Sequence, residues 1–178
     1  MTIFEKIKIR VKEQFPKEYA CHLLFVLEVA LDLNKRKGGD REIIEIASIA
    51  HDIGRVQGGD NHFHAEASSE KIIIWLKELG YNDKKISMIT RCVMMHNKTE
   101  RFHSIEEEIV SNADSLSKFM YHDMFMLMCE KDNYLDRARW GLKYIEKGYI
   151  KLTFPDLKEE YRPLYEKLKK RYESIVNT

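Results

Sequence analysis

Apolar residues recur along most of the chain at the three-to-four-residue spacing of amphipathic helices. This spacing predicts helices over residues 2–14, 17–35, 41–53, 62–79, 83–96, 104–130, 133–147 and 155–176. Only residues 149–154 have a mild β character, and no alternating run typical of a strand stands out elsewhere. The pattern therefore predicts an all-α fold.

Residues that stop or start helices divide this pattern. Pro16 separates the first two helices, and Asp40 is a suitable N-cap for the third. Gly54 and Gly80 stand where helices should end. Pro163 should kink or split the last helix because proline removes a backbone donor.

Composition narrows the class of protein. With 178 residues, 30 basic and 29 acidic, the formal net charge is +1, so no strong field attracts nucleic acid or an anionic membrane. Cys21, Cys92 and Cys129 are far apart and form no CxxC motif, which fits a reducing compartment. The start of the chain lacks an apolar signal core, and the most apolar stretch, residues 20–31, is too short to span a bilayer. We expect one soluble, cytoplasmic domain over residues 1–178, with no nucleic-acid or membrane partner.

A histidine and an aspartate stand together at the end of the third predicted helix. His51 continues the apolar stripe of Ile43, Ala47 and Ala50, so it should point inward, with Asp52 about 100° around the helix. An aspartate buried without a partner is costly. The pair therefore suits a buried divalent ion.

Four other predicted helices carry an inward polar residue on their apolar stripe, namely His22, His64, His96 and Asp114. A single histidine on an apolar face is usually a core residue hydrogen-bonded to backbone. Five such positions would each need a partner of their own, whereas one metal centre accounts for all of them. Imidazole and carboxylate ligands suit Mn²⁺, Fe²⁺, Co²⁺, Ni²⁺, Mg²⁺ or Zn²⁺.

A second His-Asp pair, His122-Asp123, lies in a methionine-rich segment. It lacks the small-residue helix and the terminal glycine that surround His51 and Asp52. We interpret this pair as incidental, and the methionines around it as core packing.

Three further residues are candidates for substrate binding. Arg55 follows the first His-Asp pair and could clamp a phosphate with two hydrogen bonds, or be a solvated arginine at a helix end. His62 belongs to a polar loop but stands two residues from His64 and could line the site. Lys118, one turn beyond Asp114, could add charge for a phosphate, with an exposed surface lysine as the favoured alternative.

Two segments carry a family resemblance. IASIAHDIGR, residues 46–55, and IVSNADSLS, residues 109–117, resemble the signature segments of the HD-domain superfamily of metal-dependent phosphohydrolases. The resemblance extends over roughly residues 18–125 and implies a compact HD-domain helical bundle. Residues 133–178 are expected to pack on this core, where they could shape a lid or a dimer face. The matching positions imply core metal ligands at His22, His51, Asp52 and Asp114.

The resemblance also bears on the number of ions. His64 and His96 match the additional histidines of the two-metal branches, which include HD-GYP phosphodiesterases and in which the HD aspartate bridges two ions. The chain departs from HD-GYP proteins at His96-Asn97, where those have paired histidines, at Arg55, where they have lysine, and in lacking a GYP segment. Hydrolysis of a cyclic dinucleotide is therefore not implied.

These observations favour a metal-dependent phosphohydrolase that acts on a small phosphate ester or nucleotide through one or two divalent ions. Asp52 would be a catalytic ligand, and Arg55 would position the phosphate. The alternatives are a di-iron HD-fold oxygenase, which uses a similar ligand set, and a regulatory HD module without turnover. The sequence is compatible with an oligomer.

Overall fold

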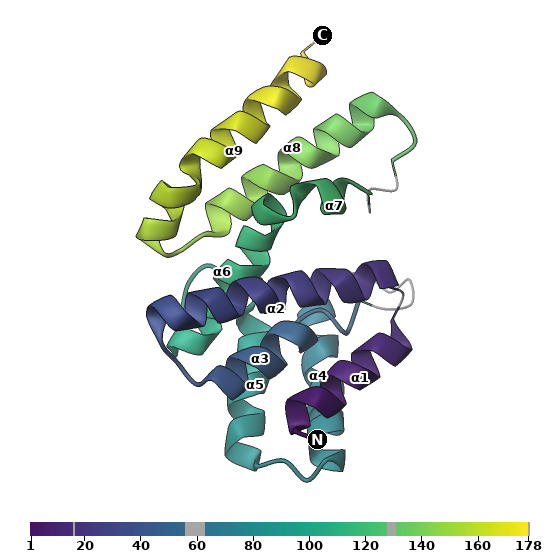
Figure 1. The fold of residues 1–178 in the computed structure, drawn as a ribbon, viewed down its shortest axis with the longest axis vertical. Coiled ribbons are helices and arrows are strands. Elements are labelled where there is room, and N and C mark those ends of the chain that lie inside the picture. The colour runs from purple at the N-terminus through teal and green to yellow at the C-terminus, as the bar shows by residue number, and fades with distance from the viewer. Residues whose placement is uncertain (16, 56–62, 128–130, 178) are drawn as a thin grey trace. The chain divides into compact units, whose positions relative to one another are not determined.

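A computed structural model describes residues 1–15, 17–55, 63–127 and 131–177. In these ranges the chain forms helices and no strand, which confirms the all-α prediction (Figure 1). The helices are α1 (Ile3–Gln14), α2 (Lys17–Lys37), α3 (Arg41–Ala50), α4 (His64–Glu78), α5 (Asp83–Met95), α6 (Ile105–Met120), α7 (His122–Leu127), α8 (Tyr134–Lys151) and α9 (Pro155–Val176). No helix in the described ranges is long and apolar enough to cross a membrane.

The chain forms two compact units, an N-terminal unit of residues 1–114 and a C-terminal unit of residues 115–178. The chain passes from one unit to the other within α6. The expectation that residues 133–178 pack on the HD core as part of a single domain stays a prediction.

Helix α3 is the centre of the N-terminal unit, and α1, α2 and α5 pack against it. Seven of its ten residues are buried, because isoleucine and alanine occupy most of its positions. Asp40 caps the helix as predicted, since its carboxylate accepts hydrogen bonds from the backbone N–H groups of Glu42 and Ile43. The backbone N–H of Asp40 donates in turn to Glu106 at 2.8 Å, which joins the starts of α3 and α6.

Gly54 lets the turn after α3 lie directly on α4. Its backbone N–H donates to Ser68 Oγ at 2.8 Å. A Cβ atom at this position would lie 2.6 Å from the carbonyl oxygen of His64 and would also collide with the backbone nitrogen of Ser68. Glycine is therefore required for the close approach that brings His51 and Asp52 beside His64.

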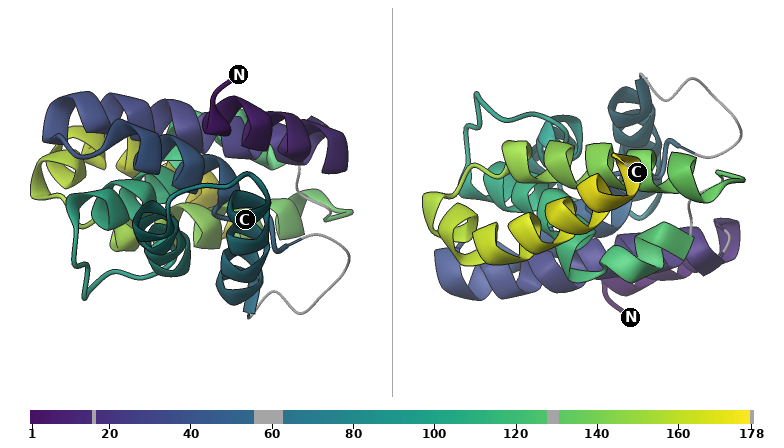
Figure 2. Two further views of the ribbon diagram at one scale, coloured as in Figure 1. Left: turned by 90° about the horizontal axis from the view of Figure 1, so that it is seen from below. Right: turned by 90° about the horizontal axis from the view of Figure 1, so that it is seen from above.

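In the C-terminal unit, α8 and α9 run side by side in opposite directions (Figures 1 and 2). The rings of Tyr149 and Tyr165 stack with their centroids 4.1 Å apart. Tyr172 packs so closely on Gly141 that a Cβ there would lie 2.6 Å from its ring.

The structure departs from the predicted helices most clearly in four places. The third helix ends at Ala50 instead of Ile53, because His51 to Gly54 form a turn. The helix expected over residues 104–130 is interrupted at Tyr121, which separates α6 from α7. Pro163 does not split α9, which is helical from Pro155 to Val176. Residues 149–151, expected to have a mild β character, continue α8.

We predict that Gly54→Ala destabilises the N-terminal unit. The added methyl group would press on the rigid backbone of α4, and such overpacking costs about 1–3 kcal/mol in the free energy of unfolding. Thermal or urea unfolding followed by circular dichroism measures the change. An unfolding midpoint equal to that of the unmodified chain would show that the turn and α4 can separate without cost.

Candidate metal centre

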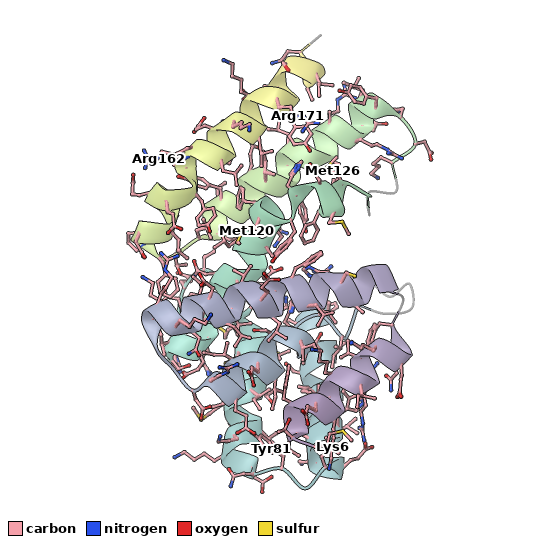
Figure 3. All side chains as sticks on the ribbon, in the orientation of Figure 1. Lys6, Tyr81, Met120, Met126, Arg162 and Arg171 are labelled. Carbon is pink, nitrogen blue, oxygen red and sulfur yellow. The ribbon has the colours of Figure 1, made fainter. Side chains whose placement is uncertain are left out.

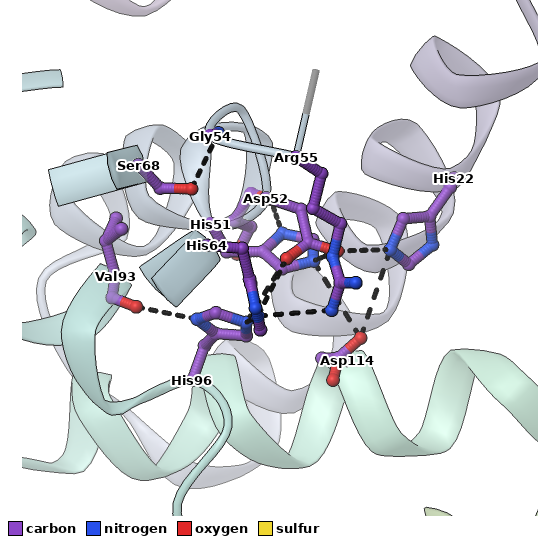
Figure 4. A network of polar contacts seen from close by, with 11 residues as sticks. His22, His51, Asp52, Gly54, Arg55, His64, Ser68, Val93, His96 and Asp114 are labelled. Atoms are coloured by element: carbon purple, nitrogen blue, oxygen red, sulfur yellow. Dashed lines mark hydrogen bonds and ion pairs between the residues drawn. The ribbon is translucent and has the colours of Figure 1, made fainter. Parts of the chain in front are cut away.

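The six predicted ligands come together in the N-terminal unit, although five helices or helix ends supply them (Figure 4). His22 lies on α2, and Asp114 lies on α6. His51 and Asp52 follow the last residue of α3, and His96 follows the last residue of α5. His64 is the first residue of α4. All six side chains are buried.

His22, His51 and Asp114 form one group that could hold a metal ion, since one ligand atom from each lies within 4.8 Å of the others. The Nε2 atoms of His22 and His51 lie 4.0 and 3.8 Å from Asp114 Oδ1. Two nitrogens and one carboxylate oxygen are therefore turned toward one buried point.

Asp52, His64 and His96 form a second such group. The Nε2 atoms of His64 and His96 lie 3.4 and 3.3 Å from Asp52 Oδ1. They lie 3.1 Å from each other. These atoms again converge closely enough to share one cation.

The carboxylate of Asp52 connects the two groups. Its Oδ1 atom faces His64 and His96, while its Oδ2 atom lies 3.6 Å from His22 Nε2 and 3.7 Å from His51 Nε2. Each oxygen of one carboxylate is thus directed at a different group, which is the arrangement of a bridging ligand.

Two backbone carbonyls set the tautomers of His51 and His96. His51 Nδ1 lies 2.7 Å from the carbonyl oxygen of Ser48, and His96 Nδ1 lies 2.6 Å from that of Val93. Because a carbonyl oxygen only accepts, each Nδ1 carries the proton and each Nε2 presents a lone pair. His51 Nε2 is buried and has no hydrogen-bond partner in the described ranges, which suits a metal ligand.

The protonation states of His51 and Asp52 also suit a cation. Burial lowers the pKa of His51 to about 3, so its imidazole is neutral near pH 7. Burial alone would raise the pKa of Asp52, but the imidazoles of His51, His22 and His96 outweigh burial and hold that pKa well below its usual range. A neutral imidazole and an ionised carboxylate are the forms that bind metal.

Arg55 lies at the edge of this centre. Its Nε atom is 2.5 Å from Asp52 Oδ2, and a terminal guanidinium nitrogen is 3.1 Å from His64 Nε2. About 34% of its side chain is exposed. The structure therefore brings Arg55 beside the predicted ligands while leaving part of it accessible to solvent.

The two other residues predicted to bind substrate are His62 and Lys118. His62 falls outside the described residues. Lys118 belongs to the C-terminal unit, where its ammonium lies 5.6 Å from the ring centroid of Tyr144. The favoured alternative of an exposed lysine is wrong, because only 8% of Lys118 is exposed and its aliphatic stem lies against Gly148. Its role in substrate binding stays a prediction.

The second His-Asp pair belongs to no candidate metal group in the part of the chain that the structure describes. His122 Nε2 instead lies 2.6 Å from the hydroxyl of Tyr172, and both residues are in the C-terminal unit.

The site residues that we did not predict are Ser48 and Val93, whose backbone carbonyls contact His51 and His96. Each carbonyl stands three residues before a histidine that follows a helix, a spacing visible in the sequence once the helix ends are known.

Comparison with known proteins agrees with this architecture. The HD domain family model matches residues 19–118, more than half of the chain, and the chain belongs to this family. HD domains bind divalent metal ions, and the two groups of histidine and aspartate side chains could hold them.

The fold is similar to two solved structures. The crystal structure of a HD-superfamily hydrolase from Bacillus thuringiensis has a TM-score of 0.67 and 19% sequence identity, covering 96% of this chain and 93% of that one. A protein from Listeria innocua has a TM-score of 0.60 and 16% identity, covering 98% and 96%. An uncharacterized protein of Clostridium beijerinckii is 28% identical over 139 residues, which are 75% of this chain and 80% of that protein.

We predict that the metal-free protein loses stability as the pH falls below 6.5. His51 has a pKa of about 3 when folded and an ordinary value of 6.5 when unfolded, so the unfolded chain binds more protons between these values. Its contribution to stability is complete above pH 6.5 and is lost progressively toward pH 3. Unfolding midpoints measured in a chelator at several pH values test this. His51→Asn should flatten the dependence while His103→Asn preserves it, and equal slopes in both variants would contradict the assignment.

Proposed function

We propose that this protein is a metal-dependent phosphohydrolase that acts on a small phosphate ester or nucleotide. The observation that carries the proposal is the carboxylate of Asp52, with one oxygen directed at each of two groups of imidazoles. The chemistry of the donors supports divalent metals, and the similar fold of a HD-superfamily hydrolase supports hydrolysis.

The residues present fit a pair of ions. His22, His51 and Asp114, with Asp52 Oδ2, would hold one ion, and His64 and His96, with Asp52 Oδ1, would hold the other. When bound, the ions supply a water of lowered pKa and neutralise charge on the phosphoryl oxygens. Nitrogen and oxygen donors accommodate Mn²⁺, Fe²⁺, Co²⁺, Ni²⁺, Mg²⁺ or Zn²⁺.

The chain's own contribution is orientation and charge. Asp52, ionised and buried, holds its two oxygens toward the two groups. Arg55 is partly exposed beside it, and the planar guanidinium fork matches the geometry of a phosphate. Arg55 would therefore bind nonbridging oxygens of the substrate, with His62 and Lys118 as further candidates for phosphate binding.

A di-iron oxygenase is the second candidate, because two groups joined by one carboxylate could equally hold two iron ions. Oxygen consumption by the iron-loaded protein, with no release of phosphate from any ester, would favour it. A regulatory module without turnover fits less well, since all six candidate ligands remain buried and convergent.

Removing a ligand should abolish both metal binding and hydrolysis. Asp52→Ala and His51→Ala each take away a buried donor, so we expect the rate of phosphate release to fall by at least about a hundredfold. A panel of phosphate esters and nucleotides, assayed with several divalent metals, measures activity, and elemental analysis measures bound metal. His103→Ala, an exposed histidine outside both groups, is the matched control and should retain both properties. Full metal content and full rate in the Asp52 and His51 variants would place the chemistry elsewhere.

The two-ion arrangement predicts a change in stoichiometry. His64→Ala or His96→Ala should lower the metal content from two ions toward one per chain, because His22, His51 and Asp114, with Asp52 Oδ2, would still hold the other ion. Metal content after loading with Mn²⁺ and with Fe²⁺ measures this. An unchanged count in both variants would contradict the two-ion centre and the di-iron alternative together.

A further inference from the structure

A groove in the C-terminal unit lies between α7 and α9. Two adjoining cavities of about 410 and 240 Å³ form it, and they share His122, Asp123 and Arg171. Met120, Met126 and Arg171 are labelled in Figure 3. None of the residues that line the α7–α9 groove is a candidate metal ligand.

One side of the groove is apolar although it faces solvent. Met120 and Met124 are 46% and 42% exposed, so the interpretation of these two methionines as core packing is wrong. Leu164 and Leu168 line the same cavity from α9. Methionine side chains are flexible and polarisable, so they adapt to varied apolar ligands. Exposed apolar surface inside a cavity favours the binding of an apolar group.

The other side of the groove is cationic. Lys167 and Arg171 stand one turn apart on α9, and neither side chain has an ion-pair partner in the described part of the chain. Arg137, at the far end, donates to the backbone carbonyl of Lys131 and forms no ion pair with the residues that the structure describes. Among the described residues of the lining, Asp123 is the one acid beside three basic residues, so they carry an excess of positive charge.

Buried contacts hold the groove in shape. The hydroxyl of Tyr172 lies 2.6 Å from His122 Nε2, and both side chains are buried. His122 Nδ1 lies 3.3 Å from Oδ1 of Asp123, whose side chain is exposed to solvent. Burial lowers the pKa of His122, so its imidazole is neutral near pH 7 and the positive charge comes from the lysine and arginines.

We propose that the α7–α9 groove binds a small amphipathic anion, with its carboxylate or phosphate head on Lys167 and Arg171 and its apolar body on Met120 and Met124. The larger cavity, of about 410 Å³, falls within the range of small-molecule sites, roughly 300–1,000 Å³, and the smaller one adjoins it. Two adjacent cations favour an anionic head. An anion without an apolar body binds more weakly, because it buries no apolar surface on Met120 and Met124.

Decanoate, used below its micellar concentration, is the probe. Calorimetric titration of the full chain should show saturable binding. The double variant Lys167→Gln with Arg171→Gln should weaken it by about tenfold or more, because charge-assisted hydrogen bonds are lost. Lys170→Gln removes an exposed charge from the same helix outside the groove lining, so it should bind decanoate as the unmodified chain does. Asp123→Asn should strengthen binding, since it removes an acid from the lining.

Two further ligands separate the head from the body. Decanol lacks the anion and acetate lacks the apolar body, so each should bind at least about tenfold more weakly than decanoate. Decyl phosphate should compete with decanoate if the site accepts both heads. Absence of saturable decanoate binding, equal binding of decanol, or unchanged binding in the double variant with intact helix content would each overturn the proposal. A dimer that the double variant dissociates would also overturn it, by assigning the groove to a second copy of the chain.

Discussion

The buried carboxylate of Asp52 is the constraint around which the N-terminal unit is arranged. An ionised carboxylate away from water is stable only among groups that compensate its charge. The Arg55 guanidinium contacts its Oδ2 atom, and four imidazole nitrogens lie 3.3–3.7 Å from its two oxygens, where a cation shared with them would compensate the charge further. Three helices besides α3, namely α2, α4 and α5, bring His22, His64 and His96 to this carboxylate, so its surroundings depend on the packing of all of them.

Helix ends reinforce this arrangement. His51 and His96 each follow the last residue of a helix, α3 and α5 respectively. The carbonyl groups of the final helical turn have no hydrogen-bond partner within the helix. Those carbonyls accept the Nδ1 protons, which directs both Nε2 atoms inward. The negative ends of two helix dipoles therefore lie close to the point where a cation would bind, and they add to the attraction from Asp52 and Asp114. Gly54 completes the arrangement by letting the turn rest on α4.

The candidate metal centre and the α7–α9 groove belong to different parts of the chain. The HD domain match covers residues 19–118 and contains every candidate ligand. The residues that line the groove run from Phe119 to Ile175 and so lie beyond that match. The candidate metal centre and the proposed amphipathic-anion site thus use different residues, and they can be tested by variants that share no residue.

Periodicity by itself determined the helical class and most helix positions, because burial of an apolar stripe is a local property of the sequence. It also identified His22, His51, Asp52, His64, His96 and Asp114, since a polar residue on such a stripe needs a partner. The family resemblance implied a bridging aspartate, but only the tertiary structure shows that Asp52 Oδ1 faces His64 and His96 while Oδ2 faces His22 and His51, because no spacing along one helix shows what other helices bring beside it. It likewise decided that Lys118 is buried, because Gly148 and the aromatic ring of Tyr144, which are distant from Lys118 in sequence, set its environment.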